Sequence, residues 1–367
     1  MMTRSTSTQK KGAFGWKELL VSLFLIITVW AGADLLGFGG SSKPIEISEG
    51  ASIQVFFTTP RYPDRPTDRH GGLDERLVAA IDGATQSVDV AAFELNLTSV
   101  TDALVRAHQR GVRVRLVTES DYAGALGPTR LLQAQIPVVF DNRPPFMHNK
   151  FVIIDGQQVW TGSWNLTYNC TYRNNNNVIV SDSKLLAENY TVEFEEMFID
   201  GQFGAKSPDN TPHPQIEIDG VHVETFFESE GDARARMIQL IKGAKSSLNV
   251  MAFVFTDDDI ASAIIARHRA GIPVRMVFEA RNVDTPGSDV AVFQQAGIDV
   301  LLDGNPYIMH HKVIIVDQAI VVTGSYNFSR NAADYNDENV LILHDTGIAG
   351  QYIAEFERVY EQAKAAQ

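Results

Sequence analysis

The stretch HNKFVIID at residues 148–155, closed by GSWN at 162–165, decides the fold of this chain, because it occurs twice. The second copy reads HHKVIIVD at 310–317 and ends in GSYN at 324–327. Every matched position in the second copy lies 162 residues after its counterpart in the first copy. Two identical spacings of six residue types are far beyond chance. The pattern therefore indicates an internal duplication.

The duplication extends well beyond these two motifs. In each half, a helical pattern is followed by a strand, then by a second helix that ends at Gly111 or Gly271, and then by a further strand. The distance between matched residues is 160 at these glycines, 170 at Phe56 and Phe226, and 162 from Leu131 onward. These changes in the distance between matched residues indicate insertions or deletions in loops, while the helices and strands correspond in the two halves. Alternating helices and strands of this length predict an α/β fold made of two homologous domains.

The 367 residues divide into six expected segments. The boundary between the domains is set by a stretch rich in glycine, proline and polar residues. The segments are a basic tail at 1–18, a transmembrane anchor or signal segment at 19–36, a linker at 37–47, the first domain at 48–200, a second linker at 201–216 and the second domain at 217–367.

An apolar segment follows the basic tail. Residues 19–30 read LLVSLFLIITVW, and with their flanks they reach the length of about 17–25 residues that a bilayer-spanning helix needs. Basic residues before the segment and acidic residues after it favour an N-terminus inside and the remaining chain outside. The AGA sequence at 31–33 also resembles a signal-peptidase site. We therefore expect the domains on the extracytoplasmic side, either anchored or secreted, with a merely buried helix as the third alternative.

Composition restricts the kinds of partner. The formal net charge is −14, and the first 17 residues carry four basic and no acidic residues, so the rest of the chain is more acidic still. An acidic body repels polyanions at long range, which disfavours nonspecific binding of nucleic acid unless a local basic groove overrides it. Cys170 is the only cysteine, which excludes an intrachain disulfide and a cysteine-rich metal site.

The duplicated motif places a histidine and a lysine on one face of a strand. Side chains alternate along a strand, so His148 and Lys150 point the same way, whereas Asp155 lies an odd number of residues from His148 and points to the opposite face. The histidine and lysine are therefore expected to work together, and the aspartate is expected to support them. The second copy supplies His310, Lys312 and Asp317 by the same reasoning.

The residue types in these motifs suit phosphate chemistry. Lysine and the motif asparagines, Asn165 and Asn327, donate hydrogen bonds to phosphate oxygens. Histidine can act as nucleophile or as general acid and base near neutral pH. Two histidines on opposite sides of a phosphate suggest attack by one and protonation of the leaving group by the other. Two lysines already neutralise the phosphate, so no metal or other cofactor is expected.

Both copies resemble the phospholipase D superfamily, whose signature is HxKxxxxD followed by GSxxN. The repeat around the motifs covers nearly all of residues 50–365, so the resemblance is not local. It implies two α/β/α sandwich domains packed as a pseudo-dimer, with both motifs in one site at their interface. Because one chain carries both motifs, we expect a monomer to be active. The matched residues are His148, Lys150, Asp155, Gly162, Ser163, Asn165, His310, Lys312, Asp317, Gly324, Ser325 and Asn327.

The resemblance also implies a mechanism. It predicts a covalent phosphohistidine intermediate, resolved by water or an alcohol, with His148 as the nucleophile and His310 as the general acid. In this family an acid further along the chain holds the histidine, and the second copy has Glu338 where the first has Asn176. We expect Glu338 beside His310, where its charge would favour the protonated form of an acid, and His148 without such a charge. Supporting roles fall to Asp155, Asp317, Ser163 and Ser325.

Several substrates fit this mechanism. The first expectation is hydrolysis of a glycerophospholipid on the headgroup side by a membrane-tethered enzyme. Alternatives are a metal-independent endonuclease acting on nucleic acid, and a cardiolipin-synthase-like transfer in which an alcohol captures the intermediate. A non-enzymatic protein that binds phospholipid headgroups would be expected to lack part of the motifs, and no motif residue is missing.

Overall fold

The computed structural model describes residues 46–48, 50, 52–228 and 230–367. The expected tail at 1–18 and the expected anchor or signal segment at 19–36 lie outside these residues. In the part of the chain that is described, no helix is both long and apolar enough to cross a bilayer.

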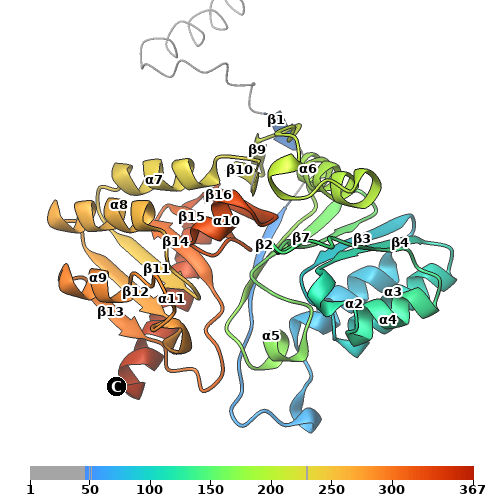
Figure 1. The fold of residues 1–367 in the computed structure, drawn as a ribbon, viewed down its shortest axis with the longest axis horizontal. Helices are drawn as coiled ribbons and strands as arrows, with labels where there is room; N and C mark the ends of the chain where they lie inside the picture. The colour runs from blue at the N-terminus through green and yellow to red at the C-terminus, as the bar shows by residue number, and fades with distance from the viewer. Residues whose placement is uncertain (1–45, 49, 51, 229) are drawn as a thin grey trace, which may run out of the picture. The chain divides into compact units, whose positions relative to one another are not determined.

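The first half is built around a seven-stranded mixed sheet with the order β2-β8-β7-β6-β3-β4-β5 (Figure 1). Its strands are β2 (Ile53–Phe57), β3 (Ser87–Ala92), β4 (Arg113–Thr118), β5 (Val138–Phe140), β6 (Lys150–Ile154), β7 (Gln158–Gly162) and β8 (Asn177–Ser181). Its helices are α2 (Leu73–Gly83), α3 (Thr98–Gln109), α4 (Leu126–Gln133), α5 (Tyr168–Tyr172) and α6 (Lys184–Glu195), which continues into a π-helical turn, η4 (Glu196–Asp200).

The second half repeats this arrangement around a nine-stranded sheet with the order β1-β9-β10-β16-β15-β14-β11-β12-β13. Its strands are β9 (Gln215–Ile218), β10 (Val221–Glu228), β11 (Leu248–Ala252), β12 (Val274–Phe278), β13 (Asp299–Leu302), β14 (Lys312–Val316), β15 (Ile320–Gly324) and β16 (Glu338–His344). Its helices are α7 (Ala233–Gly243), α8 (Asp258–Arg269), α9 (Val290–Gln295), α10 (Arg330–Asp334) and α11 (Thr346–Ala366). The predicted α/β class with two domains is therefore confirmed.

One strand lies where the sequence did not place it. β1 (Glu46–Ser48) pairs in parallel with β9 at the edge of the second sheet. Residues 46 and 47 were expected in a linker, and residue 48 was expected to begin the first domain. β9 in turn begins inside the expected linker at 201–216. A short edge strand pairs through backbone hydrogen bonds, which do not depend on the side chains. Three residues are also too few to show the alternation of apolar and polar residues from which a strand is predicted.

Alternate side chains of the central strands pack into different clusters. In β6, Phe151 and Ile153 face a cluster that both halves share, whereas Val152 and Ile154 face an outer cluster formed with α2 and α3. β14 divides in the same way, with Val313 and Ile315 in the shared cluster and Ile314 and Val316 in an outer one. Helices α6 and α11 complete the shared cluster. Both faces of each central strand are covered, which explains the continuous apolar runs after Lys150 and Lys312.

The motif glycines allow two strands to end in close contact with their neighbours. Gly162 and Gly324 have φ values of 148° and 149°, which side chains rarely adopt. A Cβ atom at Gly162 would overlap the carbonyl oxygen of Asn177, and one at Gly324 would overlap that of Asn339. These glycines bring the serine that follows them against β8 or β16.

We expect Gly162→Ala to lower the free energy of unfolding by about 1–3 kcal/mol, because the strained backbone and the overlap with Asn177 must both be accommodated. Urea unfolding of the full chain measures this change. Gly83→Ala is the control, because no atom lies within 4 Å of its added Cβ. It should leave stability unchanged or raise it by about 0.5–1 kcal/mol, since Gly83 is helical. Equal unfolding midpoints for Gly162→Ala and the wild type would contradict this account.

Candidate active site

The two motifs meet because each is attached by its backbone to the other half. The amide of His148 donates to the carbonyl of Asp337 at 2.9 Å, and the amide of His310 donates to the carbonyl of Asn175 at 2.9 Å. The residues before the histidines, Met147 and Met309, form parallel bridges with the same partners. Both histidines therefore lie at one junction between the halves, as the resemblance implied.

His148 is held by side chains of the second half. Its Nδ1 donates to Oε2 of Glu338 at 2.7 Å, and the hydroxyl of Ser325 donates to the same oxygen at 2.5 Å. The ring also packs edge-on against Phe93, with the centroids 4.8 Å apart. The histidine is buried and Glu338 is fully buried. The carboxylate fixes the tautomer with hydrogen on Nδ1 and leaves Nε2 for chemistry.

His310 is held by neutral groups of the first half. Its Nδ1 lies 2.9 Å from Oδ1 of Asn176 and 3.0 Å from the carbonyl oxygen of Ser163. The hydroxyl of Ser163 donates to the same Asn176 oxygen at 3.0 Å. Phe253 packs against this ring with the centroids 4.7 Å apart. Each motif serine thus orients the side chain that holds the other half's histidine.

The expected position of Glu338 is wrong. Glu338 contacts His148 rather than His310, and His148 is therefore the histidine with a charged partner. The cause is an exchange of contacts across the interface: Glu338, the first residue of β16, and Asn176, which directly precedes β8, each contact the histidine of the opposite half. Spacing within one copy cannot reveal which copy a side chain will meet. Asn176 was noted in the sequence only as the position matching Glu338, yet it is the partner of His310.

The motif lysines sit between their histidines and an aromatic ring. Nζ of Lys150 donates to the carbonyl of His148 at 2.7 Å and lies 5.0 Å from the ring centre of Phe93. Lys312 repeats both contacts with His310 and Phe253, at 3.0 and 4.8 Å. Phe93 and Phe253 were missed in the sequence, although each directly follows an equivalent strand in its half, which is the signal that could have found them.

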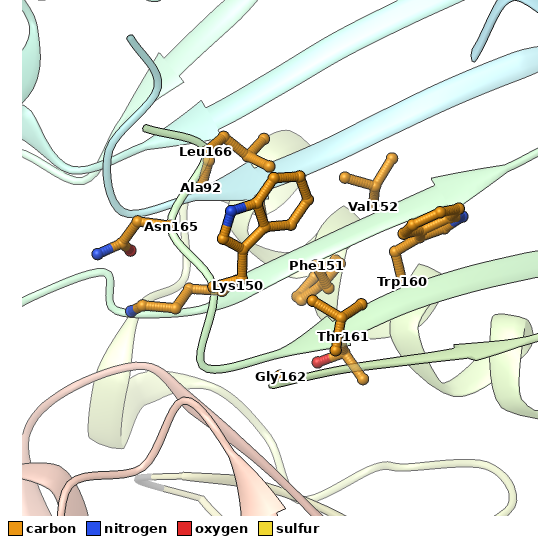
Figure 2. Close-up of a pocket in the computed structure, with 12 residues that line it drawn as sticks. Ala92, Lys150, Phe151, Val152, Trp160, Thr161, Gly162, Asn165 and Leu166 are labelled. Carbon is orange, nitrogen blue, oxygen red and sulfur yellow. The ribbon is translucent and has the colours of Figure 1, made fainter. Parts of the chain in front are cut away.

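The motif asparagines have acceptors that remain unused by the protein. Oδ1 of Asn165 and Oδ1 of Asn327 are both buried without a hydrogen-bond partner. Figure 2 shows the polar ends of Lys150 and Asn165 directed the same way, away from Trp160. The cavity drawn there is otherwise lined mainly by apolar side chains and reaches neither histidine. We therefore place the reacting group at the polar ends of these residues rather than inside that cavity.

The motif aspartates lie away from the histidines. Asp155 accepts hydrogen bonds from the backbone amides of Thr85, Gln86 and Ser87 at 2.7–3.1 Å. Asp317 accepts from the amides of residues 245–247 at 2.6–3.1 Å. These contacts fasten the loop that leads into β3 or β11. The aspartates therefore support the sheet that carries the site and do not reach a substrate.

Burial shapes the charges of the site. It lowers the pKa of His148 to about 4, despite the opposing effect of Glu338, and Lys150 and Lys312 lower it further. Burial likewise lowers the pKa of Lys150 to about 7, and places the pKa values of His310 and Lys312 well below their ordinary range. A bound anion would favour the charged form of every one of these groups. Binding of an anion at these groups would therefore be accompanied by an uptake of protons.

The fold and the site define a two-domain protein of the phospholipase D type, with both motifs in one chain. The family model described as "Cardiolipin synthase, PLD-like domain" matches residues 77–198 and 237–360, once in each half. The chain belongs to this family, which confirms the resemblance drawn from the motifs.

Curated relatives cover part of the chain. The human mitochondrial cardiolipin hydrolase is 35% identical over 130 residues, which are 35% of this chain and 52% of that protein. A phospholipase D from Rickettsia prowazekii is 34% identical over 137 residues, 37% of this chain and 67% of that protein. The chain spans about half the length of the curated relatives it matches first.

A solved structure agrees with the fold over both halves. The phosphatidylserine synthase from Haemophilus influenzae superposes with a TM-score of 0.64 at 12% identity and covers 87% of each chain. At this identity the likeness concerns the fold alone.

We expect binding of sulfate, a tetrahedral dianion that does not titrate near neutral pH, to take up protons at pH 7. The bound charge should raise the pKa of Lys150 from about 7, so that this lysine gains proton occupancy at pH 7. Calorimetric titration in two buffers with different ionisation heats measures the uptake. Lys150→Met should reduce it. Identical heats in both buffers would show that the pKa of this lysine does not respond to an anion.

Proposed function

We propose that this protein is a phosphodiesterase of the phospholipase D type that cleaves a glycerophospholipid on its headgroup side through a phosphohistidine intermediate. The observation that carries the proposal is the pair of buried histidines, one from each half, both held through Nδ1 by the opposite half. This arrangement leaves two Nε2 atoms and two lysines for one phosphate. The halves then act as a pseudo-dimer, and a single chain contains a complete site.

The unequal partners of the histidines support distinct roles. In the first step Nε2 of His148 attacks phosphorus, the bond from phosphorus to the headgroup oxygen breaks, and His310 protonates that oxygen. Phosphorylation gives the His148 ring a positive charge, which the Glu338 carboxylate stabilises. His310 is held only by neutral oxygens, so nothing retains the proton that it must release. We therefore keep His148 as the nucleophile and His310 as the general acid. The reason is now the contact of Glu338 with His148, whereas the sequence had suggested a contact with His310.

The second step reverses the proton transfer. His310, now neutral, accepts a proton from water, the water oxygen bonds to phosphorus, and the bond from phosphorus to Nε2 of His148 breaks. Lys150 and Lys312 offset the negative charge on the phosphoryl oxygens in both steps, and the amides of Asn165 and Asn327 donate to them. The products are a free headgroup alcohol and phosphatidic acid.

A lipid substrate is favoured by two observations. Two curated relatives that match about a third of the chain are named cardiolipin hydrolase and phospholipase D. The acidic chain disfavours a polyanion. We further propose that residues 19–36 anchor the protein or direct its secretion, so that it acts on the extracytoplasmic side. Transfer to a second alcohol is the alternative, because the matching family is described as cardiolipin synthase and the same intermediate serves both reactions.

We expect His148→Ala and His310→Ala each to remove nearly all turnover, with loss of the acid lowering it about 10²–10⁴-fold. A substrate with a good leaving group separates the two roles. With bis(4-nitrophenyl) phosphate, His310→Ala should still be phosphorylated on His148 and should accumulate the adduct, because no base activates water. Intact-mass measurement detects the adduct, and peptide mapping locates it.

The control for this experiment is His311→Asn. His311 is adjacent to His310 but points to Glu355, 3.0 Å away, and the matching residue of the first half is already Asn149. This variant should keep its turnover. An adduct on His310 in His148→Ala would reverse the assigned roles, and near-wild-type turnover of either alanine variant would eliminate the two-histidine mechanism.

We expect the full chain in detergent to release product from phosphatidylcholine or cardiolipin and to leave single-stranded DNA intact. Thin-layer chromatography resolves phosphatidic acid from products of transfer when glycerol or phosphatidylglycerol is added. Formation of a new phosphatidyl ester would favour the transferase alternative. Cleavage of DNA alone would replace the lipid substrate with a nucleic acid.

A further inference from the structure

Three glutamates converge at a second junction between the halves. Glu193 lies near the end of α6, Glu196 begins the π-helical turn that follows it, and Glu230 comes from the loop between β10 and α7. One carboxylate oxygen from each lies within 4.8 Å of the other two. Glu193 is 4% exposed and Glu196 is 5% exposed, so these two carboxylates are largely removed from water, whereas Glu230 is partly exposed.

These carboxylates lack the partners that buried charges require. Both oxygens of Glu196, and Oε2 of Glu230, are buried without a hydrogen-bond partner. Glu193 accepts a hydrogen bond from Nδ2 of Asn149 at 2.8 Å, and its carboxyl group is hydrogen-bonded to that of Glu230. The described residues supply no ion pair to any of the three. Buried carboxylates in proteins are paired, protonated or bound to a metal ion, because an isolated buried charge is costly.

The second half shows how the same position is neutralised when a cation is built in. Glu355 matches Glu193 at the constant offset of 162 residues, and it contacts Nε2 of His311 at 3.0 Å and the guanidinium of Arg358 at 2.6 and 2.8 Å. In the first half, Asn149 stands where the second has His311, and Glu196 stands where it has Arg358. The first half therefore has neither the histidine nor the arginine at these positions, and a second carboxylate has taken the place of the arginine.

We propose that Glu193, Glu196 and Glu230 bind a hard divalent cation, Ca²⁺ or Mg²⁺, which supplies the charge that Arg358 supplies to Glu355. A set of carboxylate oxygens without nitrogen or sulfur suits these ions rather than zinc or copper.

The ion would have a positioning role. It would join the end of the first half to the loop before α7 in the second half. Glu193 is linked to Asn149, and Asn149 accepts a hydrogen bond from Asn339 at 3.0 Å. Asn149 lies between His148 and Lys150 in the sequence, so the ion would be separated from the site by one layer of side chains and would not touch the substrate.

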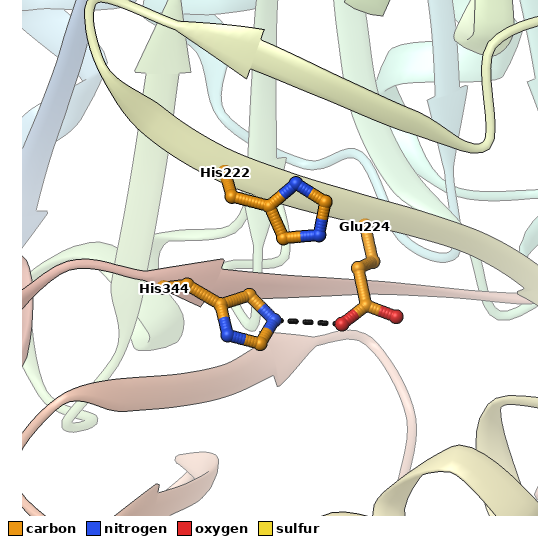
Figure 3. A group of neighbouring side chains, drawn as sticks. All are labelled: His222, Glu224 and His344. Carbon is orange, nitrogen blue, oxygen red and sulfur yellow. Dashed lines mark hydrogen bonds and ion pairs between the residues drawn. The ribbon is translucent and has the colours of Figure 1, made fainter. Parts of the chain in front are cut away.

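A different cluster, formed by His222, Glu224 and His344, serves as an internal control (Figure 3). Its carboxylate is already satisfied: Nε2 of His344 lies 2.6 Å from Oε1, and Arg236 donates to both oxygens at 2.7 Å. Because this carboxylate already has a cation in Arg236, the cluster gives no reason to expect a hard divalent ion.

The test is calorimetric titration of CaCl₂ and MgCl₂ into full-length protein that has been stripped with EDTA. We expect the wild type to bind one ion at this cluster, and Glu196→Gln to weaken binding at least about tenfold. Glu196→Arg should abolish binding and unfold at or above the temperature of the metal-free wild type, because it restores the arrangement of Glu355 and Arg358. Glu195→Gln changes an adjacent, half-exposed residue outside the cluster and should bind like the wild type.

Three results would overturn the proposal. They are no binding of either ion by the wild type, binding that survives Glu196→Gln unchanged, and binding that is lost in His344→Gln instead. Since the readout is ion binding, the result does not depend on whether the proposed lipid hydrolysis is correct.

Discussion

The structure depends on an exchange of contacts across the interface between the halves. Each histidine is carried by one half and is oriented by the other, through Glu338 for His148 and through Asn176 for His310. The backbone makes the same exchange, since each histidine amide donates to a carbonyl of the opposite half. The positive φ values of Gly162 and Gly324 serve the same exchange. The serines that follow these glycines donate to Asn176 and Glu338 and hold these orienting residues at the interface.

The duplication makes the two halves nearly symmetric. The differences between them concern the residues to which we assign distinct roles. The backbone bridges, the lysine contacts and the packed phenylalanines recur in both halves with similar distances. Two departures stand out: one histidine has a charged partner and the other a neutral one, and one buried glutamate has an arginine where its counterpart has another glutamate. Each departure concerns where a charge is placed inside the protein, where solvent screens it least.

The sequence predicts the α/β fold and identifies the motif residues, because both follow from local periodicity and spacing. Strand alternation alone separates His148 and Lys150 from Asp155, and the structure places them accordingly. The contacts between the halves cannot be predicted in this way. An orienting residue can contact the histidine of its own half or that of the other half, and the spacing in the sequence is the same in both cases. Glu338 was therefore assigned to the wrong histidine. Phe93, Phe253 and the edge strand β1 also depend on tertiary contacts.

Exchange between unlike halves gives a reason for keeping them in one polypeptide. If the first half paired with another copy of itself, both histidines would meet Asn176, and two second halves would give both histidines Glu338. Only a mixed pair holds one orienting group of each kind. Covalent fusion of the two halves in one polypeptide enforces that one-to-one stoichiometry at any concentration. The peptide between the domains thus ensures that each first half pairs with a second half. It excludes the two symmetric dimers, each made of two identical halves, that separate chains could form.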